Sequence, residues 1–286
     1  MTDLHADHLA DLRKSGLHDE MIALMRLRSL DAGGLARELG RPINSVQSAL
    51  VIPYPSFAFQ FDDPSASPPF QRYKLFPPGR DKDGRPVRYW QAPDSGVHLY
   101  ILPAVRAVLT DARVPLYWTE GEKKAAKATQ EGFHCVGLGG LWNWTDSKTG
   151  KGISELDGIV HVGRIEVIAP DSDVWARPNL LQAVFAFGKE LEARGAHVFV
   201  VVLPPAGSAK GGLDDYLVAA DPDRFRGLPQ IELKDKAFTR QREWYSTDLL
   251  RGKRVTNVTN ATRPACQARR WLSTVRHLPL IRASPA

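Results

Sequence analysis

Three apolar runs in the second half of the chain alternate with stretches of helical character. The runs cover residues 114–119, 164–170 and 197–203, and each has the length of a buried strand. Residues 122–131 are rich in strong helix formers, and residues 178–194 form a second helical stretch. Because strands that alternate with helices form parallel sheets with right-handed crossovers, the pattern predicts an α/β fold here.

Residues 51–113 have a different pattern. Short apolar segments are separated there by Pro, Gly and Asp, which is typical of strands joined by tight turns. Cations and aromatic rings that are interleaved in this way suit a path for single-stranded nucleic acid. They fit equally well an aromatic core whose cations reach out to water. The residues concerned include Arg72, Tyr73, Lys74, Arg85, Arg88, Tyr89 and Trp90.

The N-terminal segment is expected to be helical. An apolar stripe at helical spacing runs through residues 3–29, and two short helices are expected on either side of Gly40. Two short helices around a glycine turn fit a DNA-reading helix-turn-helix, and they fit a packing bundle as well. We therefore divide the chain into N-terminal helices (1–50), a small β-rich basic subdomain (51–113), an α/β domain (114–233) and a basic, partly disordered tail (234–286).

Charge is unevenly distributed along the chain. The formal net charge is +6, and residues 234–286 hold 12 Lys and Arg against 3 Asp and Glu. A basic tail on a nearly neutral body suggests contact with a polyanion, most plausibly nucleic acid. A solvated tail without a partner accounts for the same composition.

Several classes of protein are disfavoured by what the sequence lacks. No apolar run approaches the ~20 residues of a membrane span, and the first residues do not form a signal peptide, so we expect a cytoplasmic protein without membrane contact. Cys135 and Cys266 are not spaced as zinc ligands, and Cys135 lies in an apolar run that predicts a buried thiol. No GxxxxGK[ST] loop is present, so ATP-driven helicase activity is not encoded.

Carboxylates follow the ends of two predicted strands. Glu120 follows the first apolar run, and Asp171 and Asp173 follow the second. In a parallel sheet these ends meet at the carboxyl edge, where open α/β sheets bind ligands. Asp171 and Asp173 would point the same way on an extended backbone, and the repulsion between them favours a divalent cation, Mg²⁺ or Mn²⁺. Helix capping accounts for any one of these acids alone.

The third apolar run leads into a further charged motif at the same edge. Lys210 could offset the acids or bind a phosphate. Asp214 is expected as the capping acid of the following helix, and Asp215 as a residue that supports the metal ligands. Glu120 could serve as a general base near a metal-bound water or hydroxyl.

Three motifs together resemble a Toprim-like family of uncharacterised domains. That family occurs in primase/helicase-type replication proteins of phages, plasmids and other mobile elements, and the resemblance covers roughly residues 4–220. The motifs are Thr119-Glu120-Gly121-Glu122-Lys123-Lys124-Ala125, Gly137-Leu138-Gly139-Gly140-Leu141-Trp142-Asn143-Trp144 and Lys210-Gly211-Gly212-Leu213-Asp214-Asp215-Tyr216.

The resemblance implies a Toprim-like (Rossmann-like) parallel sheet, preceded by a small β-rich primase-type subdomain and N-terminal helices. It implies that Glu120 is the catalytic acid/base and that Asp171 and Asp173 are metal ligands. It also implies that cations of the β-rich subdomain line the path of template and nucleotides. The cations are Arg72, Lys74 and Arg88.

The resulting hypothesis is primase-like, Mg²⁺-dependent nucleotidyl transfer in the replication of a mobile element. Its expected partners are single-stranded DNA and nucleotides, together with a replicative helicase. The usual zinc-binding module of primases is absent from the sequence, which leaves template recognition by that route without a basis. Two alternatives stay open: a Toprim-type nuclease with the same acids, and a non-catalytic nucleic-acid-binding accessory protein.

Overall fold

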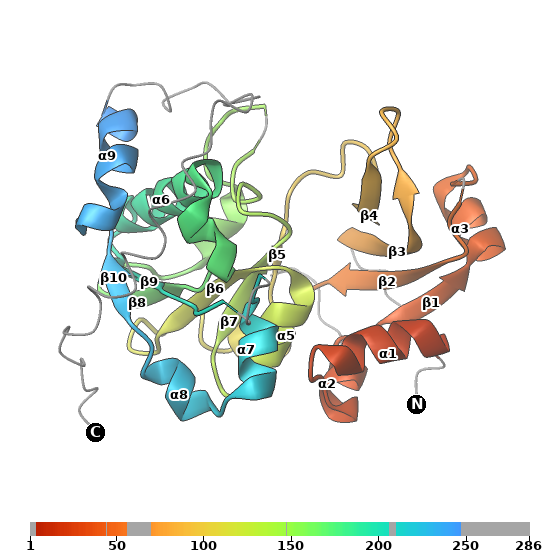
Figure 1. The fold of residues 1–286 in the computed structure, drawn as a ribbon, viewed down its shortest axis with the longest axis horizontal. Coiled ribbons are helices and arrows are strands. Elements are labelled where there is room, and N and C mark those ends of the chain that lie inside the picture. The colour runs from red at the N-terminus through yellow and green to blue at the C-terminus, as the bar shows by residue number, and fades with distance from the viewer. Residues whose placement is uncertain (1–3, 44, 56–69, 147, 206–209, 247–286) are drawn as a thin grey trace.

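The fold is a mixed α/β arrangement of two sheets that lie side by side (Figure 1). A computed structural model describes residues 4–43, 45–55, 70–146, 148–205 and 210–246. Within them, a four-stranded sheet has the order β1-β2-β3-β4, and a six-stranded sheet has the order β10-β9-β8-β6-β7-β5.

The first sheet is antiparallel throughout. Its strands are β1 (Arg28–Asp31), β2 (Ser48–Tyr54), β3 (Phe70–Arg80) and β4 (Pro86–Trp90). All of β2 is buried, because side chains alternate between the two faces of a strand and both faces are covered. Leu50 and Ile52 belong to the main core, whereas Ala49 and Val51 belong to a smaller cluster around Leu35.

Three helices accompany this sheet: α1 (Ala6–Lys14), α2 (Asp19–Leu24) and α3 (Ala32–Leu39). The helical stretch predicted for residues 3–29 is divided at Gly16, whose φ of +70° interrupts it, and it ends before β1. The prediction of a second helix after Gly40 is wrong, because strand β2 begins at Ser48. The apolar residues before Tyr54 follow a strand pattern that continues through this segment.

The second sheet is parallel in its centre and antiparallel at both edges. The parallel strands are β6 (Leu116–Glu120), β7 (Cys135–Leu138), β8 (Ile165–Ile168) and β9 (His197–Val201). The edge strands are β5 (Leu99–Tyr100) and β10 (Gln230–Glu232). The predicted alternation of strands and helices is therefore confirmed for the central strands.

The α-helices of this part lie within the described residues from 103 to 246. They are α4 (Pro103–Arg106), α5 (Glu122–Gln130), α6 (Pro178–Ala193), α7 (Leu213–Ala219), α8 (Pro222–Arg226) and α9 (Thr239–Ser246). Helix α5 packs on β7 and α7, and α6 packs on β8 and β9 with α9 against it. Figure 1 shows α5 and α7 on the side of the second sheet that adjoins α2 and β2.

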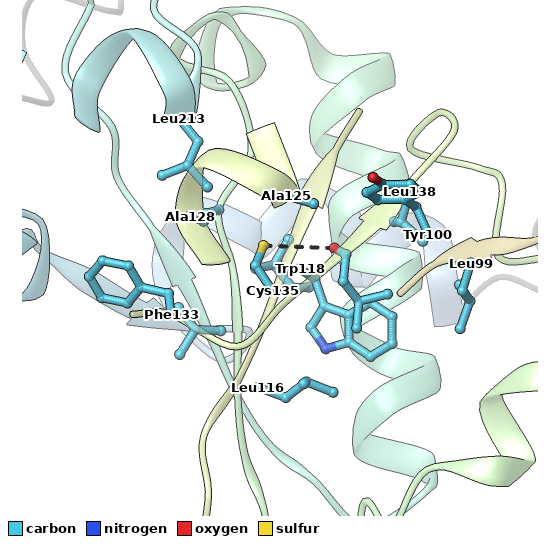
Figure 2. Close-up of a cluster of buried hydrophobic side chains, with 14 of the residues drawn as sticks. Leu99, Tyr100, Leu116, Trp118, Ala125, Ala128, Phe133, Cys135, Leu138 and Leu213 are labelled. Carbon is cyan, nitrogen blue, oxygen red and sulfur yellow. Dashed lines mark hydrogen bonds between the residues drawn. The ribbon is translucent and has the colours of Figure 1, made fainter. Parts of the chain in front are cut away.

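The core of the second sheet joins strands and helices that are distant in sequence. Figure 2 shows Trp118 of β6 and Cys135 of β7 gathered with Ala125 of α5 and Leu213 of α7. The predicted buried thiol is confirmed, and burial raises the pKa of Cys135. On α6, the ring centroid of Phe187 lies 5.1 Å from that of Trp118.

None of the helices in the described ranges is long and apolar enough to cross a membrane. The division of the chain at residues 50, 113 and 233 stays a prediction, although the first sheet also includes β1 from the segment expected as helices. Most of the predicted basic tail, residues 247–286, lies outside the described residues.

Candidate functional site

Glu120 is the last residue of β6, at the carboxyl edge of the parallel strands. The next residue, Gly121, has a φ of +105°, a conformation that side-chain-bearing residues rarely adopt, and α5 begins immediately after it. The Gly121 amide donates to the Leu138 carbonyl oxygen of β7 at 2.7 Å. The Glu-Gly motif thus ends one strand, turns the chain and fixes Glu120 beside β7.

Asp171 and Asp173 lie beyond the end of the neighbouring strand, β8. The backbone is extended at Asp171 but then enters a short 3₁₀ helix, Ser172–Ala176, so the two residues do not share the continuous strand that was expected. The Asp171 side chain makes no capping hydrogen bond to this helix. Helix capping therefore does not account for Asp171.

Two lysines hold the Asp171 carboxylate, which is only 4% exposed. Lys124 of α5 donates to Oδ1, and Lys210 Nζ lies 2.5 Å from Oδ2. The same Lys210 nitrogen lies 3.8 Å from Asp173 Oδ1, and Arg177 donates to Asp173 Oδ2 at 3.1 Å. The carboxylates therefore form a compact charged cluster with cations from three separate segments.

The protonation of Glu120 is shifted by this environment. Burial raises its pKa, Asp171 and Asp173 add to the rise, and Lys124 and Lys210 oppose it. Burial alone would lower the pKa of Lys210, but its carboxylate neighbours raise it above the usual value. A carboxyl group with a raised pKa at a ligand-binding edge suits general acid–base chemistry.

The Lys210 segment is tied to the Asp171 segment by the main chain. The Ser172 amide donates to the Gly211 carbonyl oxygen at 2.9 Å, and the Gly211 amide donates to Ser172 Oγ at 2.8 Å.

Asp215 accepts from the Gly212 amide at 2.9 Å and so caps α7, the role that was predicted for Asp214. Asp215 is the third helical residue, the position from which a carboxylate can reach back to the cap. Asp214 is buried in the first turn of α7.

The donor chemistry of the cluster fits Mg²⁺. Within the described residues, no three His, Cys, Asp or Glu lie close enough together to form a complete ligand set. However, Asp171 Oδ2 and Asp173 Oδ1 are buried oxygens that face the Lys210 ammonium group and accept no well-aligned hydrogen bond from the described residues. Mg²⁺ commonly takes one or two carboxylates and completes its shell with water and substrate phosphate. Asp171 and Asp173 are the residues that would hold it.

The three cations predicted to contact nucleic acid lie on the first sheet, away from this cluster in sequence. Arg72 of β3 is only 11% exposed and donates to Glu122 of α5 at 2.7 Å and to the Gly139 carbonyl oxygen at 3.2 Å. Lys74 is largely buried and lies 2.5 Å from Asp11 Oδ2 of α1. Arg88 on β4 is exposed. Contact of all three with nucleic acid stays a prediction.

Sequence reasoning missed the two cations that complete these charged groups. Lys124 follows Glu120 by four residues, and the first turn of α5 brings it back to the carboxyl edge. Lys123, beside it, lies 3.0 Å from Asp11 and so connects α5 to α1. The signal is present in the run Glu122-Lys123-Lys124, which belongs both to the helix-forming stretch and to the first of the three motifs.

Similarity to known structures defines the class of fold. The RNA polymerase domain of Mycobacterium tuberculosis primase DnaG matches with a TM-score of 0.54 and 14% identity, over 82% of this chain and 79% of that one. The zinc-binding and RNA polymerase domains of the Aquifex aeolicus primase match with a TM-score of 0.51 and 14% identity, over 79% of this chain and 57% of that one. A DnaG primase catalytic domain bound to ssDNA matches with a TM-score of 0.49 and 15% identity, over 86% of this chain and 84% of that one. The first two of these matches show that the fold is similar to that of primase catalytic domains.

A family model gives a narrower match. Residues 105–224 match the family described as Domain of unknown function (DUF3854), and this range contains the whole acidic cluster. No curated protein matches the sequence. The chain spans a little over half of the Aquifex aeolicus primase fragment that it resembles.

Proposed function

We propose that this protein is a primase-like nucleotidyltransferase with a Toprim-type site, acting on single-stranded DNA with Mg²⁺ or Mn²⁺ in the replication of a mobile element. The observation that carries the proposal is the acidic cluster of Glu120, Asp171 and Asp173 at the carboxyl edge of a parallel sheet. The similarity of the fold to primase catalytic domains supports it.

The reaction assigns a role to each side chain of the cluster. A 3′-hydroxyl attacks the α-phosphorus of an incoming nucleoside triphosphate, a P–O bond forms, and pyrophosphate leaves. Glu120 takes the hydroxyl proton, a role that its raised pKa suits at neutral pH. When bound at Asp171 and Asp173, a divalent ion supplies charge stabilisation for the phosphoryl oxygens.

Lys210 has a second role in this proposal. Its side chain is half exposed, and its ammonium group balances the charge of Asp171. From this position at the carboxyl edge, Lys210 would contact the triphosphate of the incoming nucleotide. Lys124 is more buried and keeps Asp171 oriented throughout.

The test is a primer-synthesis assay with labelled nucleotides, circular single-stranded DNA and Mg²⁺ or Mn²⁺. We expect labelled oligomers from the wild-type protein, none from Asp171→Asn, and a decrease of roughly 10²- to 10⁴-fold for Glu120→Gln. Asp223→Asn is the matched control, because Asp223 is an exposed carboxylate on α8 that pairs with Arg226 and does not belong to the acidic cluster.

The same gel separates the alternatives. Circles that are cut by the wild-type protein and stay intact with Asp171→Asn would replace the proposal with a nuclease. DNA that is bound without synthesis or cleavage by either protein would contradict an enzymatic role and indicate a binding module. Equal synthesis by wild type and Asp171→Asn would refute the assignment of the site.

A further inference from the structure

The segment that follows β7 leaves the second sheet at the same edge as Glu120. Strands β6 and β7 are parallel neighbours, and Glu120 pairs in register with Leu138, the last residue of β7. Gly139 and the next residues therefore begin one strand away from the proposed catalytic carboxyl. Arg72 contacts the Gly139 carbonyl oxygen, so the segment also adjoins the first sheet.

Trp142 in this segment is 41% exposed, and it is the one tryptophan in the described ranges whose side chain is classed as exposed. Its ring lies nearly parallel to that of Trp144, at an interplanar angle of 23° and a centroid distance of 6.3 Å. Trp144 is only 7% exposed, and its centroid lies 5.6 Å from that of Phe187 on α6. A ring anchored in the core thus supports a ring that is open to solvent.

A tight hairpin follows the two tryptophans. Asp146 Oδ1 accepts from the amides of Lys148 and Thr149 at 2.6 and 3.0 Å, and the Asp146 amide donates to the Lys151 carbonyl oxygen at 2.8 Å. Thr145 forms a β-bridge with Gly152, which closes the hairpin. These main-chain bonds give the segment a defined shape before any ligand binds, which lowers the entropic cost of binding.

The hairpin carries two exposed cations, Lys148 and Lys151. Neither side chain forms an ion pair with any of the described residues. Two cations of the first sheet differ, since Arg72 and Lys74 are already paired with carboxylates. Free cations beside an open aromatic ring are the combination that binds single-stranded nucleic acid, because the cations meet phosphates and the ring stacks on a base.

We infer that residues 139–146 and 148–152 form a contact surface for single-stranded nucleic acid, in which Trp142 stacks on a base while Lys148 and Lys151 meet the backbone. The inference rests on the proposed function, because it gives the substrate strand a path to the acidic edge. It assigns the stacking role to a segment other than the basic strands of the first sheet.

The experiment measures binding of the full-length protein to a fluorescent oligo(dT) strand by anisotropy, without nucleotides or divalent metal. A matched strand of equal length carries abasic sites in place of the bases. We expect Trp142→Ala to weaken binding to oligo(dT) by roughly 5- to 150-fold and to leave binding to the abasic strand unchanged. Trp142→Phe should retain most of the affinity, because its ring can still stack.

Two further variants keep the inference falsifiable. Trp244→Ala on α9 also removes one tryptophan and should bind like the wild type. The double variant Lys148→Gln, Lys151→Gln should weaken both strands and reduce the salt dependence of binding by about 1.4 in logarithmic slope, which is 0.7 for each lost contact with a single strand. Melting temperatures of all variants show whether they are folded.

Unchanged affinity of Trp142→Ala for oligo(dT), or an equal loss for both strands, would overturn the inference. If the Trp142 surface bound a protein partner instead, Trp142→Ala would keep its affinity for oligo(dT). The outcome is separable from the proposed function, since binding is measured without synthesis. Suppose that Trp142→Ala loses affinity for oligo(dT) but not for the abasic strand, and that the wild-type protein synthesises no primers. This result would refute the proposed enzymatic activity and support the binding surface.

Discussion

At the scale of single residues, the buried ion pair of Arg72 and Glu122 connects the first sheet to helix α5. Glu122 is 1% exposed, and it also accepts from the Tyr54 hydroxyl at 2.5 Å. Removing one partner of a buried pair leaves an uncompensated charge, so Arg72→Met should lower the free energy of unfolding by about 3–5 kcal/mol. Urea denaturation followed by circular dichroism measures the change.

The control for Arg72 is the double variant Arg72→Met, Glu122→Gln, which removes both charges. We expect it to recover most of the lost stability, since replacing a buried pair by neutral residues costs little. A fully stable Arg72→Met protein that had lost affinity for single-stranded DNA would contradict this and return Arg72 to the nucleic-acid path.

A second prediction at this scale concerns pH. His98 Nδ1 lies 2.5 Å from Glu155 Oε1, and Nε2 lies 2.9 Å from the Ser95 carbonyl oxygen, so the protonated ring satisfies both acceptors. The bond to Glu155 raises the pKa of His98, although burial opposes the rise. The protonated His98 ring therefore contributes fully to the free energy of unfolding below about pH 6.5, the usual pKa of histidine. This contribution is lost as the pH rises through the raised pKa of His98 in the folded protein.

The measurement for His98 is the melting temperature of wild type and His98→Gln between pH 5.5 and 9. The gap between them should be widest at low pH and should narrow as the pH rises. His197→Gln, at an exposed position on β9, serves as the control and should show no such trend. A gap that is constant over this range would show that His98 is not protonated in the fold.

How far the site could be predicted from the sequence depends on the kind of information needed. Glu120, Asp171 and Lys210 were found because the ends of parallel strands share an edge, which follows from the strand pattern alone. The pairing of Arg72 with Glu122 and of Lys124 with Asp171 could not be found in this way. Such pairs depend on which elements become neighbours in three dimensions, and interleaved cations look the same whether they face DNA or a buried carboxylate.

At the scale of elements, the contact between α5 and the second sheet requires a small residue at Gly137 of β7. A Cβ atom there would lie 3.1 Å from the Cβ atoms of Ala125 and Tyr100 and 3.3 Å from the Gly121 carbonyl oxygen. These atoms belong to backbone or to short stems that cannot rotate away. Gly137→Ala should therefore destabilise the protein by roughly 1–3 kcal/mol and displace α5 together with Lys124.

Chemical denaturation of Gly137→Ala measures this cost, and Gly33→Ala is the control. Gly33 lies in α3, where a Cβ would meet only ordinary contacts at 3.5 Å or more, so alanine should stabilise the helix by up to about 1 kcal/mol. If both alanines behaved alike, the close packing of α5 on β7 would not limit the fold.

The elements that were predicted correctly have strong patterns. Strands β6, β8 and β9 are continuous apolar runs between clear helices, so their type follows from length and composition. Strand β1 was missed because its four residues have an exposed, partly polar pattern, and it exists because it pairs with β2. Pairing between strands is a tertiary property, and a four-residue strand contains no periodicity that would reveal it.

At the scale of the whole molecule, the proposed nucleic-acid path combines three regions: the acidic edge, the stacking segment and the C-terminal tail. The acidic edge is built by the second sheet, and the inferred stacking segment leaves that same sheet after β7. The C-terminal tail contributes charge only, since residues 247–286 hold eight Lys and Arg and one Asp. The sequence predicts the tail's charge but not its position, because charge alone does not specify a fold.

The tail should act on affinity through salt-dependent contacts with phosphates. A protein that ends at Ser246 should bind single-stranded DNA more weakly than the full chain, with a shallower dependence of log affinity on log salt. If half of the eight cations contact phosphates, the slope should decrease by about 3, at about 0.7 for each contact.

Anisotropy titrations between low and moderate salt measure this slope, and the control is a full-length protein whose eight tail cations are replaced by Gln. Because counterion release depends on charge rather than on chain length, the control should match the truncated protein. A control that kept the slope of the wild type would show that the tail does not bind DNA through its charge.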